Sequence, residues 1–135
     1  MKDGRIFFVA GVVKRDGKVL LGLNSGKREV WTLPERAVSR DYAQEFERAG
    51  DIARQVVLEE TGLMSSQLDF LDVREVCYGN RREVVLLYEC YVKGEPRAAG
   101  GDKTWVWFDP HKIPKNVSLS LRAYRSLEEG LNGGE

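Results

Sequence analysis

Acidic side chains gather in one part of this sequence of 135 residues, and basic side chains gather in another. Residues 41–75 contain nine Asp or Glu and three Arg, whereas residues 1–30 contain seven Lys or Arg and three acids. Divalent cations such as Mg²⁺ prefer carboxylate oxygens as ligands, and basic groups attract phosphate. This distribution is typical of a site that joins a divalent cation to a phosphate, and equally of the solvated faces of a helix.

Glu59 and Glu60 are the acids whose position favours chemistry most directly. They are adjacent and stand immediately before Thr61-Gly62, where a helix is expected to end. A helix dipole disfavours carboxylates at that end by about 0.3 kcal/mol or more. A functional role and an ordinary solvated surface charge therefore explain these two acids equally well. Glu47 is a further candidate for a functional acid, and an ordinary acid on the helix surface is the alternative interpretation.

The segment that carries these acids has the pattern of an amphipathic helix from about residue 41 to residue 61. Gly62 supplies the stop. One stripe of this helix is apolar and consists of Ala49, Ile52, Ala53, Val56 and Val57.

The remaining elements are expected to be mostly strands. Apolar and β-branched runs predict strands at residues 6–13, 19–23, 30–33, 68–78, 83–92 and 104–108. Asp16-Gly17 favours a hairpin between the first two, and Pro34 stops the third. A last helix is expected to be capped by Ser118 or Ser120 and to end at Gly130. The order predicts an α+β fold, an αβα sandwich with a mixed sheet, as one domain over residues 1–130 with a flexible tail at 131–135.

The stretch Trp31-Thr32-Leu33-Pro34, followed by Glu47 and then by Gln55 to Leu63, resembles the Nudix hydrolases. Their signature is Gly, five residues, Glu, seven residues, Arg-Glu, an aliphatic residue, any residue, Glu-Glu, any residue, Gly and an aliphatic residue. Glu47, Val57, Glu59-Glu60, Gly62 and Leu63 fit this frame without a gap.

This resemblance implies a Nudix-like αβα sandwich and an enzyme that cleaves a nucleoside diphosphate linked to another moiety. It implies Mg²⁺ or Mn²⁺ as cofactor, with Glu47, Glu59 and Glu60 as metal ligands and Glu59 and Glu60 as the catalytic residues.

The Nudix signature of this chain is degenerate at three places. Glu35-Arg36 replaces the Gly-Gly that commonly follows Leu-Pro in the family, Gln55 replaces the Arg, and Val56 replaces the first helix carboxylate. Val56 instead extends the apolar stripe, so we expect it in the core. Two hypotheses follow: a weakened hydrolase, or a catalytically inactive module that binds a nucleotide or a protein.

Several residues outside the signature are candidates for contacts with a ligand. Arg36, Arg81 and Trp105 are expected to bind substrate, although a hairpin tip explains Arg81 and a strand aromatic explains Trp105 as well. Further metal ligands or a base could come from Asp51, which shares a helix face with Gln55 and Glu59, or from Glu89 or Asp102.

The composition limits the partners. The net charge is zero, which argues against a dedicated nucleic-acid binder, because such proteins need a basic surface. No apolar run is long enough to span a bilayer and no signal-peptide pattern is present, so we expect no membrane partner and a cytoplasmic location. The expected partner is a small-molecule nucleotide. The apolar hairpin at residues 6–23 could bury itself or serve as a homodimer surface.

Overall fold

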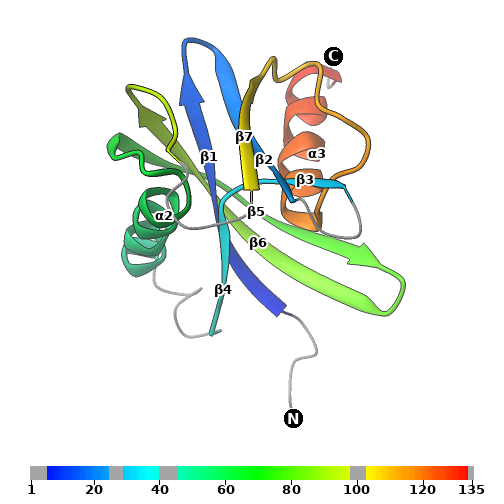
Figure 1. Ribbon diagram of the computed structural model, residues 1–135. Helices are drawn as coiled ribbons and strands as arrows, with labels where there is room; N and C mark the ends of the chain where they lie inside the picture. The colour runs from blue at the N-terminus through cyan, green and yellow to red at the C-terminus, as the bar shows by residue number, and fades with distance from the viewer. Residues whose placement is uncertain (1–5, 25–28, 40–45, 98–102, 134–135) are drawn as a thin grey trace.

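The computed structural model describes residues 6–24, 29–39, 46–97 and 103–133, and within these residues a mixed sheet lies between two helices (Figure 1). Helix α2 (Phe46–Thr61) covers one face and α3 (Leu119–Gly133) covers the other. The strands are β1 (Ile6–Arg15), β2 (Lys18–Asn24), β3 (Val30–Thr32), β4 (Glu35–Val38), β5 (Ser65–Tyr78), β6 (Arg81–Val92) and β7 (Lys103–Phe108). The predicted α+β sandwich is confirmed.

Strand β1 is the centre of the sheet. It pairs in parallel with β6 and antiparallel with β2 and β4, and β5, β3 and β7 extend the sheet outward. The β1–β2 hairpin turns through Asp16 and Gly17, whose φ angles are 51° and 77°. These left-handed values are the ones that an Asp-Gly hairpin turn requires, so the predicted hairpin forms where its sequence indicated.

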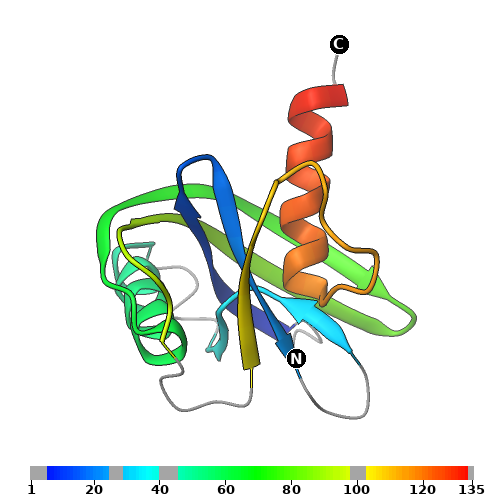
Figure 2. The same ribbon diagram turned by 45° about the horizontal axis from the view of Figure 1, so that its top comes forward.

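The two faces of the sheet have separate hydrophobic cores because side chains alternate along each strand. On β1, Val9 and Val13 join the core beneath α2, whereas Ala10 and Val12 join the core beneath α3. Figure 2 shows the two helices on opposite sides of the strands. The N-terminal hairpin, considered above as a dimer surface, buries most of its apolar side chains within this chain, although Ile6 remains 40% exposed.

A close approach of backbone to helix fixes the position of α2. A Cβ atom built on Gly11 of β1 would lie 2.6 Å from the side chain of Val57. Only glycine allows the helix to pack this near to the central strand. Val56 is 1% exposed, as the apolar stripe predicted.

Three details differ from the sequence-based expectation. Strand β4 follows Pro34 directly, where the sequence predicted no strand, because its backbone pairs with residues 7–10 of β1. Helix α3 continues through Gly130 to Gly133, since one glycine weakens a helix by only about 1 kcal/mol. The first turn expected for the long helix, at residues 41–45, lies outside the described residues. Neither described helix is long and apolar enough to cross a membrane.

Candidate functional site

The C-terminal end of α2 is held in a defined place by backbone hydrogen bonds. Gly62 has a φ of 76°, and its N–H donates to the carbonyl of Leu58 at 2.9 Å. The N–H of Arg97 donates to the carbonyl of Thr61 at 2.7 Å, and the buried hydroxyl of Thr61 donates to the carbonyl of Val57 at 2.6 Å. The last turn, which carries the adjacent acids, is therefore a rigid platform.

Glu59 forms an ion pair with Arg36 of β4. The guanidinium of Arg36 donates to Oε2 of Glu59, and both side chains remain partly open to solvent. Arg36 is one of the two residues that replace the family's Gly-Gly, so a position that carries no side chain in the family pattern here supplies a cation to the signature helix. Arg36, which we expected to bind substrate, thus lies beside the adjacent acids of the signature helix.

Glu60 forms a second ion pair, with Lys103 at the start of β7. The ammonium of Lys103 lies 2.9 Å from Oε1 of Glu60, and the two side chains are 28% and 25% exposed. The same ammonium lies 5.9 Å from the ring centroid of Trp105. Sequence reasoning missed Lys103, because its position beside Glu60 depends on the pairing of β7 with β2.

Trp105 lies on the same face of the sheet as α2. It packs against the core beneath that helix and lies over Gly22 of β2, where an added Cβ would come within 2.8 Å of the indole ring. The ring is only partly buried. A partly buried indole next to a cation is an arrangement that can stack with a nucleotide base, so Trp105 remains a candidate ligand contact.

The position of the missing carboxylate is closed to a ligand. Val56 lies in the core, and Asp51 is exposed and lies 3.9 Å from Arg54. Within the described parts of the chain, no group of three or more His, Cys, Asp or Glu side chains could hold a metal ion. The side chain of Glu47 and all of Asp102 lie outside the described residues. Of the cluster that the family resemblance implies, the described side chains are those of Glu59 and Glu60.

Two other candidates lie on the opposite face of the sheet, beneath α3. Glu89 is near Lys14, with 3.6 Å between its Oε2 and the ammonium, and that ammonium is also 3.8 Å from Glu128 of α3. Arg81 pairs with Glu83 at 2.9 Å. Neither candidate is brought together with Glu59 and Glu60.

Glu35, the other residue in place of the family's Gly-Gly, contacts the α3 side. Its Oε1 accepts hydrogen bonds from Thr32, at 2.8 Å, and from the buried hydroxyl of Ser120. The cap of α3 is Ser118, whose Oγ accepts from the N–H of Leu121 at 3.3 Å. Consecutive residues of β4 thus bind both helices: Glu35 binds α3 and Arg36 binds α2.

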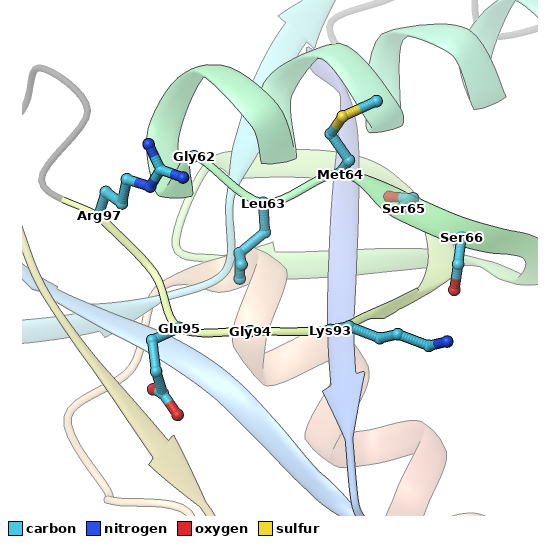
Figure 3. A pocket seen from close by; sticks show the side chains of 9 residues that line it. All are labelled: Gly62, Leu63, Met64, Ser65, Ser66, Lys93, Gly94, Glu95 and Arg97. Atoms are coloured by element: carbon cyan, nitrogen blue, oxygen red, sulfur yellow. The ribbon is translucent and has the colours of Figure 1, made fainter.

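An open pocket of about 520 Å³ lies beyond the end of α2 (Figure 3). Its walls are the segment after the helix and the segment after β6, and its lining residues are Gly62, Leu63, Met64, Ser65, Ser66, Lys93, Gly94, Glu95 and Arg97. Glu95 accepts from Arg15 and from the indole N–H of Trp107, and these hydrogen bonds lower its pKa. Sequence reasoning did not indicate this pocket, because its two walls are distant in the chain.

Comparisons with known proteins agree with this fold. The family model described as NUDIX domain matches residues 4–128, so the chain belongs to the Nudix family. The crystal structure of a MutT Nudix hydrolase from Burkholderia pseudomallei is similar, with 22% identity, a TM-score of 0.69 and coverage of 90% of this chain and 96% of that one. The MutT protein from Methanosarcina mazei Go1 is similar at 17% identity, with a TM-score of 0.75 and coverage of 99% and 97%. No curated protein sequence matches significantly.

Proposed function

We propose that this Nudix domain binds a nucleoside diphosphate linked to another moiety and does not hydrolyse it by the metal-dependent route of the family. The observation that carries the proposal is the state of the helix carboxylates. Glu59 and Glu60 are paired with Arg36 and Lys103, and the position of the third carboxylate is the buried Val56. The Nudix fold is kept, while each of the two described helix carboxylates of the signature has a cation of this chain as its partner.

The ligand contacts that we assign lie around the end of α2. Arg36 and Lys103 are partly exposed, and the guanidinium of Arg36 has more N–H donors than its bond to Glu59 uses. The free donors can reach a phosphate of the ligand, and Trp105 can stack with the base. The site thus offers cations and an aromatic surface together.

A divalent-metal-dependent Nudix hydrolase is the second candidate. It is favoured by the survival of Glu59 and Glu60 side by side on a rigid helix end, with the Glu59 side chain 50% exposed. This candidate assigns Glu59 and Glu60 as catalytic residues and metal ligands, Glu47 as a third ligand, and Mg²⁺ or Mn²⁺ as the ion.

The test is a panel of nucleoside triphosphates, ADP-ribose, dinucleoside polyphosphates and sugar nucleotides, examined for binding and for turnover. We expect one class to raise the melting temperature by about 8 °C at roughly 100 times its dissociation constant, with EDTA present. We expect no products in Mg²⁺ or Mn²⁺.

Two variants make this test specific. Trp105→Leu should weaken binding at least about tenfold, whereas Phe70→Leu, an exposed aromatic on β5, should leave it unchanged. Turnover that disappears in Glu60→Gln would overturn the proposal in favour of the hydrolase. A panel without any thermal shift would also overturn it.

A further inference from the structure

We infer that Arg36 and Lys103 replace the divalent metal ion of the Nudix site in this chain. The two side chains supply to Glu59 and Glu60 the positive charge that a bound ion would supply. This inference concerns the same site as the proposed function and rests on it only in treating that site as the place of ligand binding.

The charges at the end of α2 balance without any metal ion. Glu59 and Glu60 together carry two negative charges, and each has one cation of this chain as its partner. A divalent ion held by the same two carboxylates would bring the same total charge. Both carboxylates are therefore neutralised by cations of this chain before a metal ion binds.

The two cations are held in place by the sheet. Arg36 belongs to β4 and lies opposite Val9 of the central strand, and Lys103 belongs to β7 and lies opposite Asn24 of β2. Strand β4 is held by β1 and strand β7 is held by β2, and neither β1 nor β2 is next to α2 in the sequence. The cations therefore come to the helix end as fixed groups, as a metal ligand set would be fixed by its fold.

A metal ion would have to compete with these cations. To reach Glu59 and Glu60 it must displace both partners, and the displaced guanidinium and ammonium would remain near it as like charges. The Lys103–Glu60 pair is three-quarters buried, so solvent screens this repulsion less than at an open surface. With Val56 in the core, no third described carboxylate on the helix compensates for that cost.

The test removes the two cations and asks whether the site then binds a metal. We expect the unmodified protein to show no change of melting temperature in about 5 mM Mn²⁺, and no loss of the free Mn²⁺ signal in electron paramagnetic resonance. Arg36→Gln with Lys103→Gln should melt lower without metal. Mn²⁺ should then raise its melting temperature by about 3 °C, with about one ion bound per chain.

A matched control separates this effect from a general change of charge. Arg74→Gln with Arg82→Gln also removes two cations that pair with carboxylates, Asp72 and Glu75, on the β5–β6 hairpin. This control should gain no response to Mn²⁺. The inference is overturned if the unmodified protein binds Mn²⁺ as the double variant does, or if the double variant responds no more than the control.

A second measurement keeps the inference testable if the double variant does not fold. In a double-mutant cycle, Lys103→Gln and Glu60→Gln should each lower the melting temperature. The variant with both changes should lose less than the sum of the two single losses, because the first change already breaks the pair. Additive effects would overturn the inference. Nucleotide binding in EDTA is scored separately, so a failure of the proposed function and a failure of this inference give different results.

Discussion

The two faces of the sheet both carry carboxylates paired with cations, but in different settings. Beneath α3, Glu83 has a side chain only 4% exposed, and burial raises its pKa even though the nearby Arg81 lowers it. At the end of α2, the side chain of Glu59 is 50% exposed and that of Glu60 is 25% exposed. A buried acid such as Glu83 depends on its partner for stability, whereas an exposed acid such as Glu59 can exchange its partner for water.

This difference indicates which face is available for binding. On the α3 face, a lost partner would leave a charge without solvent, so the pairs there act in holding the fold together. On the α2 face, water can solvate the exposed carboxylate of Glu59, and a phosphate can take the place of that carboxylate beside Arg36. The comparison is therefore a physical reason, independent of the family signature, for placing ligand binding at the end of α2.

The largest expected effect comes from restoring the family carboxylate in the core. Val56→Glu should lower the free energy of unfolding by about 4 kcal/mol near neutral pH, because the position is fully buried. Urea denaturation measures the loss. Leu58→Glu, at an exposed position of the same helix, is the matched control and should change stability by less than about 0.5 kcal/mol. Equal stability of the two variants would show that position 56 can turn toward the ligand site.

The next effect concerns the buried acid on the other face. Arg81→Gln removes the partner of Glu83 and should cost about 2 kcal/mol near pH 7, whereas Arg82→Gln, whose partner Glu75 is more exposed, should cost less than about 1 kcal/mol.

The pH dependence of that effect has a definite sign. The pKa of Glu83 is raised in the folded state, so the folded protein binds its proton more tightly than the unfolded chain, and stability falls as pH rises through the window above about 4.5. Without Arg81 this fall should steepen. The cost of Arg81→Gln should therefore be smaller near pH 5 than near pH 7, and a cost that is larger at the lower pH would contradict the assignment of Glu83 as the responsible group.

The smallest effects compare the contacts of Glu35 and Arg36, two consecutive residues of β4 that bind different helices. Ser120→Ala removes a buried donor from Glu35 and should cost about 1 kcal/mol. Arg36→Gln breaks the exposed pair with Glu59 and should cost about 0.5 kcal/mol or less. Denaturation of both variants under one condition checks the order, and the reverse order would mean that the α2 side carries the more costly contact.

The core position of Val56 could be predicted from sequence because it depends on the helix period alone. Strand β4 could not, since Glu-Arg-Ala-Val has no strong strand pattern and forms through pairing with β1. The partners of Glu59 and Glu60 were equally beyond local reasoning, because they come from strands distant in the chain. The faces of Glu89 and Arg81 depend on which helix covers which side of the sheet, and alternation within a buried strand does not specify that.

Strand β4 has a consequence for the way the molecule opens. Its four residues pair with β1, the carbonyl of Pro34 accepts from the N–H of Gly11, and its first two side chains contact a different helix each. Local unfolding of β4 would thus loosen both layers together. The amide protons of β4 should accordingly exchange with solvent at nearly the rate of the central strand, as members of one cooperative folding unit.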